Sequence, residues 1–370
     1  MGLPTPTPEA SASSGGEGTG DFVALQFYVL YPQILYVPEK KEEEKNHQGN
    51  QTLLTEFILL GFGDLQELKS LLFLLFFLIY VLTMAGNILI IALVVTDGHL
   101  HTPMYFLLGN LSFLEICYAS NILPKVLARF ASGDRTISVW GCLVQFYVFA
   151  SLVVTECCLL AVMSLDRYLA ICRPLHYAMI MKDKVCLSLA AGSWVSRFSS
   201  MYIMLYLVST LTFCGPNEID HFFCDLSPLL EITCSETYII ERTTLVFSSL
   251  STFPPFLLTR TSYVFVISTI LRIPSTAGRK KAFSTCSSHL IVVTMFYGTL
   301  IIVYVLPKHK MPRALHKILS VLYTACTPLA NPLIYSLRNK EVKEALKKSV
   351  QRVLYFIRLQ RAQCRASRVE

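Results

Sequence analysis

The stretch MSLDRYLAICRPLHY, residues 163–177, sets an acid and a base side by side, Asp166 and Arg167. The pair follows directly on a long apolar run that begins at Leu152 and is almost uninterrupted. A helix in a soluble protein commonly ends in a capping residue and a turn. An apolar segment that ends in a charged pair instead needs an explanation, and the rest of the sequence supplies one.

The chain as a whole is too apolar for a soluble protein. Of its 370 residues, 53% are hydrophobic and only 15% are charged, and its mean hydropathy is +0.51. A membrane-spanning helix needs about 20 mostly apolar residues, and seven runs of that size occur. They are residues 70–95, 104–123, 139–163, 185–209, 243–270, 283–306 and 318–337. The sequence therefore predicts an all-α membrane protein, a bundle of seven transmembrane helices.

Basic residues near the ends of the spans indicate the orientation, because Lys and Arg are retained on the cytoplasmic side. With the N-terminus outside, the inner loops and the C-terminal tail carry 18 Lys and Arg, and the outer segments carry 12. The net charge of +7 comes mostly from the tail. We interpret it as a result of topology and attraction to anionic lipid, not as a nucleic-acid surface.

The chain ahead of the first span divides into two parts. Residues 1–45 are expected to be a disordered extension, because they begin with a tract rich in Pro, Thr, Ser and Gly. Residues 46–69 are expected to be an extracellular tail that is glycosylated at Asn50, where Asn50-Gln51-Thr52 forms an acceptor tripeptide. The domain of seven spans covers residues 70–337, and residues 338–370 form a basic cytoplasmic tail.

The tail is expected to begin with a short amphipathic helix on the inner membrane surface. Val342, Ala345, Leu346 and Val350 fall on one helical face, with bases on the other.

Four cysteines are expected at the outer face, which is an oxidising environment. They are Cys142, Cys214, Cys224 and Cys234. Four cysteines allow three pairings, and their spacing does not choose among them.

Polar residues inside the spans each need a reason, because an ionisable group in the membrane costs about 2.5 to 3.5 kcal/mol on insertion scales. Glu115, Asn331 and Asn87 are expected to face a common interior water pocket or cation. The alternative is a packing hydrogen bond between helices.

Two further features suggest a switch at the cytoplasmic end. Arg167 can pair with Asp166 in one state and with a partner in another, although a charge that merely reaches the headgroups would look the same in sequence. Pro332, after Asn331, removes a helical hydrogen bond and predicts a hinge one turn before Tyr335.

No catalytic or metal-binding pattern is present in the sequence. There is no Gly-rich phosphate loop and no His-Glu metal spacing. His101, His176 and His289 stand alone and are interpreted as structural. We therefore expect neither an enzyme nor a cofactor or metal.

Several motifs, in order along residues 50–350, resemble the signatures of olfactory receptors, which are seven-helix receptors of the rhodopsin-like class. They are LHTPMYFL at 100–107, the stretch quoted above, SY at 262–263, KAFSTCSSH at 281–289, FYG at 296–298 and PLIYSLRN at 332–339.

The resemblance implies roles that spacing does not give. It implies two disulfides, Cys142 to Cys224 and Cys214 to Cys234, and an acidic Glu115 at a sodium-type pocket. It implies a switch that admits a stimulatory G protein of the olfactory type, with a toggle beneath the ligand at Tyr297. The switch residues would be Asp166, Arg167 and Tyr168 with Tyr263, Asn331, Pro332 and Tyr335.

The ligand of such a receptor lies among the outer turns of the third, fifth and sixth helices. Counting helical turns along this sequence gives Phe149, Ala150, Val153, Val154, Phe247, Ser248, Ser251, Leu300, Ile301 and Tyr304. This lining is apolar with a few hydroxyls and suits a small volatile molecule of modest polarity. The alternative for each residue is packing between helices or against lipid.

The sequence departs from the pattern at Arg197 and Arg260, where uncharged residues are usual. Either arginine could pair with Glu156, but together they could impair maturation. Milder departures are Met163-Ser164-Leu165 and Ala330, and residues 1–45 exceed the usual short tail.

The expected function is odorant detection at the plasma membrane, with small volatile ligands, coupling to the stimulatory G protein and a rise in cAMP. One alternative is a receptor of the same fold with another ligand, or one that matures poorly and is inactive. A transporter or channel is a third reading. It is disfavoured because the sequence shows no internal repeats or paired broken helices.

Overall fold

Long helices account for most of the computed structural model, which describes residues 54–63, 66–214, 216–302 and 313–366. Each predicted apolar run corresponds to a helix or to consecutive helical segments. They are α2 (Lys69–Thr96), α3 (Pro103–Ser132), α4 (Val139–Cys172), α6 (Asp183–Ser209), α8 (Tyr238–Leu271), α9 (Thr276–Leu300), and α10 (Arg313–Val321), which continues through the π-helical segment η5 (Leu322–Cys326) into α11 (Thr327–Arg338). Shorter helices are η1 (Gln66–Leu68), η2 (Gly98–Leu100), α5 (Pro174–Ile180) and α7 (Leu226–Glu231).

Several helices are longer than the apolar runs that predict them. α3 continues to Ser132, nine residues beyond the predicted end at Leu123, and stops where Gly133 adopts a left-handed conformation with φ 77°. α4 starts where the Ser138 hydroxyl accepts a hydrogen bond from the Gly141 amide. Hydropathy reports only the part of a helix that lies in lipid, whereas caps determine where it ends.

Five helices among the described residues are long and apolar enough to cross a membrane by length and composition: α2, α3, α4, α8 and the segment from α10 to α11. In α9 only Cys286–Leu300 is apolar, because the helix starts in the basic residues Arg279 and Lys280. In α6, Arg197 and several serines reduce the hydropathy.

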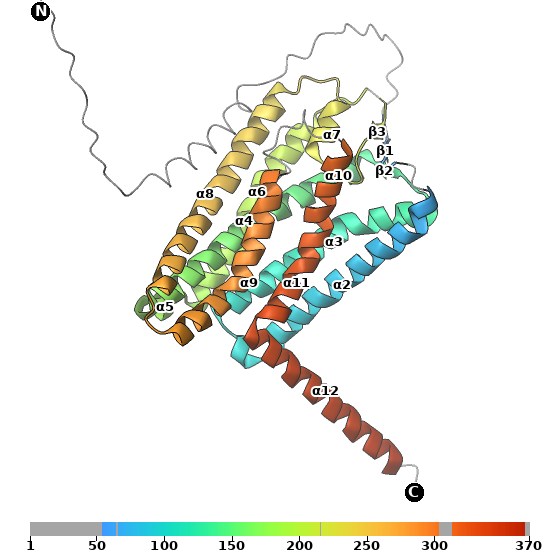
Figure 1. Cartoon of the computed structure of the whole chain (residues 1–370). Helices are drawn as coiled ribbons and strands as arrows, with labels where there is room; N and C mark the ends of the chain where they lie inside the picture. Colours follow the sequence, from blue (N-terminus) through green and yellow to red (C-terminus); the bar gives the residue numbers. More distant parts are fainter. Residues whose placement is uncertain (1–53, 64–65, 215, 303–312, 367–370) are drawn as a thin grey trace, which may run out of the picture. The chain divides into compact units, whose positions relative to one another are not determined.

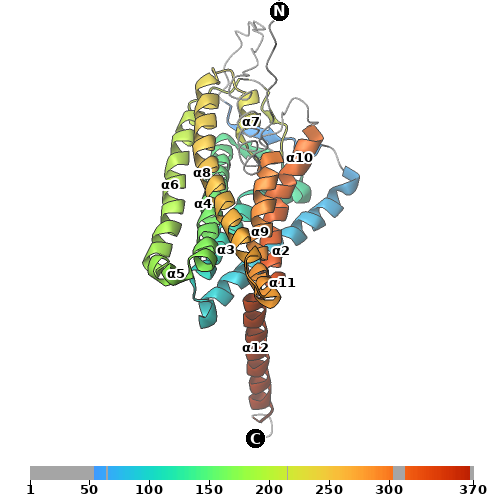
Figure 2. The ribbon, with the colours of Figure 1, turned by 60° about the vertical axis from the view of Figure 1, so that its left-hand side comes forward.

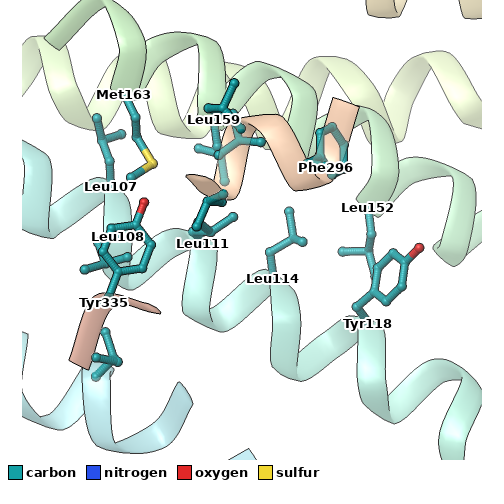
Figure 3. Packing of buried hydrophobic residues seen from close by; sticks show 14 of the residues in the cluster. Leu107, Leu108, Leu111, Leu114, Tyr118, Leu152, Leu159, Met163, Phe296 and Tyr335 are labelled. Carbon is teal, nitrogen blue, oxygen red and sulfur yellow. The ribbon is translucent and has the colours of Figure 1, made fainter. Parts of the chain in front are cut away.

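The helix α4 is at the centre of the bundle, where it contacts α3, α6, α8 and α9 (Figures 1 and 2). The largest cluster of buried side chains lies along its contact with α3, where Leu107, Leu111 and Leu114 meet Leu159 and Met163 (Figure 3). These side chains are at most 1% exposed. Dense side-chain packing of this kind holds transmembrane helices together, because lipid is as apolar as the helices themselves.

The helices α2 and α11 approach each other closely at Gly86. A β-carbon at this position would lie 3.1 Å from the Cβ and Cγ of Pro332. The next residue, Asn87, donates a hydrogen bond of 3.2 Å to the carbonyl of Pro328. A larger residue at position 86 would therefore press on the Pro332 ring, and glycine lets α2 and α11 approach closely.

The seventh span is irregular at a place that the sequence did not indicate. Pro332 lies inside the regular helix α11, whereas the wider π-helical turn η5 (Leu322–Cys326) lies six to ten residues earlier. The Thr327 hydroxyl donates to the Leu322 carbonyl at 3.2 Å and bridges this turn. The irregular turn of this span is thus at η5, whereas the hinge at Pro332 stays a prediction.

A small sheet, built from segments that lie between the long helices or before them in the chain, adds to the helical fold. It consists of β1 (Glu56–Leu59), β2 (Thr136–Ser138) and β3 (Glu218–Ile219) in the order β2-β1-β3. β1 is antiparallel to β2 and parallel to β3. The Phe57 side chain is fully buried and contacts Phe213 edge to face, with ring centroids 5.1 Å apart. Strands of two to four residues are too short to show a period of two in the sequence.

The C-terminal helix α12 (Lys340–Ala366) has 27 residues and is longer than the short helix expected. Val342 and Ala345 are buried at its start, and the lysines of that part are exposed. The Tyr105 hydroxyl donates to Glu341 Oε2 at 2.6 Å and so joins α12 to the start of α3.

Candidate functional site

The charged pair near the C-terminal end of α4 is bonded within itself. Arg167 donates from Nε and Nη2 to Asp166 Oδ2, at 3.0 and 2.5 Å. Asp166 is fully buried, and its other oxygen accepts a hydrogen bond of 2.9 Å from the hydroxyl of Tyr177 on α5. The Asp166 carboxylate therefore holds both the Arg167 guanidinium and the Tyr177 hydroxyl.

The tyrosines predicted to act with Arg167 lie close to it. Tyr263 on α8 is hydrogen-bonded to His289 on α9, and Arg167 is near enough to act electrostatically on both. Tyr335 is 1% exposed, and its hydroxyl has no hydrogen-bond partner. It is near enough to Arg167 to interact with it electrostatically. Tyr168 packs on Phe265 instead, with ring centroids 5.8 Å apart.

Two of the three polar residues predicted to meet in the membrane interior are hydrogen-bonded to each other, and the third is not. The Asn331 amide donates to Glu115 Oε1, and both residues are at most 2% exposed. Asn87 is bonded to backbone carbonyls of α2 and α11 and not to Glu115. A second acid, Glu156 of α4, is 3% exposed, has no partner for Oε1 and interacts electrostatically with Glu115.

An aromatic cluster surrounds Phe149, one of the predicted ligand contacts, which is 2% exposed. Its ring centroid lies 5.4 Å from that of Tyr118, 4.9 Å from that of Phe223 and 6.0 Å from that of Tyr323. These three residues come from α3, the long outer loop and η5. Turn counting along three helices missed them, because each lies on an element outside that count.

The other predicted lining residues are not brought together into one group. Val154 and Ser251 are buried, and Ala150, Val153, Phe247 and Leu300 are partly buried. Ser248 is exposed, and Ile301 is 38% exposed. Val153 and Leu300 pack with the α3–α4 core, whereas Ala150, Val154 and Phe247 pack with an outer cluster. Tyr304 and Asn50 lie outside the described residues.

Tyr297, the predicted toggle, lies deeper than this group. It is 5% exposed, and its hydroxyl donates to the Cys157 carbonyl of α4 at 3.5 Å. Its ring contacts Phe256 of α8 edge to face, at 5.1 Å between centroids. Tyr297 thus connects α4, α8 and α9 beneath the aromatic cluster.

The long loop between α6 and α8 is linked to α4 by a disulfide and by a hydrogen bond. Cys142 of α4 is joined to Cys224 by a disulfide with an S–S distance of 2.04 Å. Cys214 is joined to Cys234, with 5.9 Å between their Cα atoms. The Gln145 side chain accepts a hydrogen bond of 2.9 Å from the Cys224 amide.

His221, in the same loop, was not singled out from the sequence. Its ring lies 4.7 Å from that of Phe222, 4.6 Å from that of Phe223 and 5.8 Å from that of His316 on α10. It is 2% exposed, and neither ring nitrogen has a hydrogen-bond partner. Burial lowers the pKa of His221 to about 3, and the nearby His316 and Lys317 act in the same direction.

Arg197 of α6 contacts α8 and not the acid suggested by the sequence. Its Nη1 donates to Ser251 Oγ at 3.4 Å, and its Nε is buried without a hydrogen-bond partner. Within the part of the chain that the structure describes, no three His, Cys, Asp or Glu side chains are grouped to hold a metal ion.

Comparisons with known proteins point in one direction. The family model for olfactory receptors matches residues 76–353. Olfactory receptor 11A1 of Homo sapiens is 50% identical over 300 residues, which cover 81% of this chain and 95% of that receptor. Olfactory receptor 6N1 of Homo sapiens is 47% identical over 305 residues, which cover 82% and 98%.

Among solved structures, squid rhodopsin matches with a TM-score of 0.61 and 16% identity, over 78% of this chain and 87% of that one. This likeness concerns the fold, which is the seven-helix bundle expected from the sequence.

Proposed function

This chain belongs to the olfactory receptor family, and we propose that it signals through a G protein when a ligand binds. As a member of that family it is a multi-pass plasma-membrane receptor and not an enzyme. A small volatile molecule binds beside Phe149 in the outer half of the bundle. Binding favours a state in which Arg167 is released to a stimulatory G protein of the olfactory type, and the cAMP concentration rises.

The observation that carries this proposal is the bonding of Arg167 at the cytoplasmic end of α4. Its guanidinium is held by Asp166, which is held in turn by Tyr177. Tyr335, with a hydroxyl that has no hydrogen-bond partner, lies in the field of Arg167. Arg167 can exchange its bonds to Asp166 for a bond to the Tyr335 hydroxyl. A ligand that binds one of these two states more tightly shifts the equilibrium between them.

The outer half of the bundle supports a ligand of modest polarity. Phe149, Tyr118, Phe223 and Tyr323 are aromatic groups from four segments that meet at one place. Tyr297, below them, links this place through α8 and α9 to the inner half. A small apolar molecule held by shape fits such a lining.

A cAMP reporter assay with a broad odorant panel tests the proposal. Cells expressing the full chain should respond to at least one odorant, and residues 46–370 expressed alone should respond to the same odorant. Arg167→Ala should abolish the response while surface staining is retained. A response that persists in Arg167→Ala would refute the proposed route.

We also propose an extracellular N-terminus with a glycan on Asn50. The support is that β1 pairs with β2 and β3 of the disulfide-bonded outer side. An N-terminal tag should be stained on intact cells and a C-terminal tag only after permeabilisation. Asn50→Gln should remove the mass shift that a glycosidase produces. Staining of both tags on intact cells would contradict this topology.

Anionic lipid is the remaining proposed partner, bound by the basic face of α12. Lys343, Lys347 and Lys348 are exposed on this helix, whereas Val342 and Ala345 are buried. Replacing the three lysines by glutamine should weaken binding of purified receptor to liposomes that contain phosphatidylserine. Unchanged binding would rule out this contact.

A further inference from the structure

Arg197 is a cation in the middle of α6 for which the protein supplies no acid. No carboxylate among the described residues forms an ion pair with it. Its Nη1 donates to the Ser251 hydroxyl at 3.4 Å, and its charge acts on the nearby Cys158 thiol. A guanidinium keeps its charge under all physiological conditions. An unpaired one in a transmembrane helix is costly and by default indicates a functional site.

Glu156 does not serve as the partner of Arg197. The side chain that contacts Arg197 from α4 is Cys158, and Glu156 lies two residues earlier on the same helix. Residues two apart on a helix point to different sides. Glu156 instead interacts with Glu115, and its Oε1 has no partner. The acid that balances Arg197 therefore has to come from outside the described protein.

The geometry around Arg197 suits a carboxylate. The Nε of the guanidinium is buried and has no hydrogen-bond partner. Nε and the Nη group beside it form one edge of the guanidinium. A carboxylate binds this side of a guanidinium through two parallel hydrogen bonds. Ser251 is 2% exposed, and its hydroxyl accepts from Arg197, so its own proton is available for a second acceptor.

We propose that Arg197 and Ser251 form a subsite for the carboxylate of a small aliphatic acid, whose apolar tail lies along the outer cluster that includes Phe247 and Val154. This subsite rests on the proposed function and gives it a ligand class. Neutral alcohols and esters of the same length lack the charge that pairs with the guanidinium, so they bind more weakly. The carboxylate can come from a volatile acid or from a long-chain fatty acid of the bilayer.

Activation is the first test. Cells expressing the full chain are treated with straight-chain carboxylic acids of increasing length, with the matching alcohols and with the methyl esters. The acids should be the more potent series. Arg197→Gln should raise the EC50 of the best acid by about tenfold or more and leave the alcohol response within about twofold. Arg197→Lys should retain part of the acid response, because lysine keeps the positive charge but cannot form two parallel hydrogen bonds to a carboxylate.

Arg260→Gln is the matched control, since it removes another intramembrane arginine from α8, nine residues beyond Ser251. It should change surface staining but not the order of acids and alcohols. An acid response that is equal in Arg197→Gln and in the unchanged receptor, at equal surface staining, would overturn the subsite. If the most potent acid is short enough to be volatile, the site binds odorants. If the most potent acid has the chain length of a membrane fatty acid, the site binds lipid.

Binding is measured separately, so that a failure of signalling is not mistaken for a failure of the subsite. Purified full-length receptor in nanodiscs free of fatty acid is heated with and without octanoate. Octanoate should raise the melting temperature, and Arg197→Gln should abolish the rise. If octanoate stabilises the receptor but no acid raises cAMP, the subsite stands and the proposed signalling fails. If no acid either stabilises or activates the receptor, the subsite is wrong, whatever other odorants do.

Discussion

The hydroxyl of Tyr177 offers a direct test of the resting arrangement at the cytoplasmic end. Tyr177→Phe removes the 2.9 Å hydrogen bond to Asp166 and leaves the bonds between Asp166 and Arg167 in place. The ring remains, so its packing beside Leu169 and Met181 is preserved. The variant therefore isolates one bond.

The size of the effect follows from burial and charge. A hydrogen bond to a charged group contributes about 1.5 to 3 kcal/mol. Asp166 is fully buried but Tyr177 is only partly so, and we therefore take about 1 kcal/mol. This corresponds to about a fivefold change in the ratio of the two states. If about 1% of the resting receptor is active, the variant should be about 5% active.

Basal cAMP at equal surface staining is the measurement. Tyr177→Phe should raise it about fivefold, whereas Tyr355→Phe, which changes a 66% exposed tyrosine of α12, should not. Asp166→Asn should raise basal cAMP as well, and adding Tyr177→Phe to it should have little further effect, since both act on one bonded group. Unchanged basal cAMP in Tyr177→Phe would show that this bond does not stabilise the resting state.

Three further outcomes are expected. The folded protein holds the pKa of His221 near 3, whereas an unfolded histidine titrates near 6.5, so only the unfolded state gains a proton between these pH values. The free energy of unfolding should therefore fall by up to about 1.4 kcal/mol per pH unit as the pH drops below 6.5. His221→Phe should make the melting temperature depend less on pH. Cys142→Ala opens a disulfide that spans 82 residues and should destabilise the receptor by about 4 kcal/mol, seen as lost surface staining; normal staining would contradict this. Arg197→Gly combined with Arg260→Leu should raise surface staining, because the double variant has two fewer charges within the membrane. Unchanged staining would show that the two arginines do not impair maturation.

The switch residues show how far sequence reasoning reaches at this site. Asp166 and Arg167 are neighbours in the chain, so their pairing follows from the sequence alone. The hydrogen bond from Tyr177 does not, because it depends on the path that the chain takes through α5. The same holds for Glu115 and Asn331, which lie 216 residues apart and meet only in the folded bundle. The sequence suggested a shared polar cluster for them, but it also placed Asn87 there, and Asn87 bonds to backbone carbonyls instead.

The ligand region depended most on the tertiary structure. Turn counting predicted Phe149 and Ser251, which are both buried, because helical geometry fixes the depth of a residue once one reference position is known. It could not find Phe223 or Tyr323, because no helical count reaches across a loop or a π-helical turn. It also placed the exposed Ser248 among the lining residues, because depth does not specify which side of a helix faces inward.

The sequence by itself determined the number of spans, since hydrocarbon thickness imposes a length that any apolar run either meets or fails to meet. The tertiary structure alone decided which polar groups have partners. The guanidinium of Arg197 lies beside Ser251 and not beside Glu156, because the rotation of packed helices determines which side chains meet, and that rotation depends on the shapes of all the surrounding side chains together.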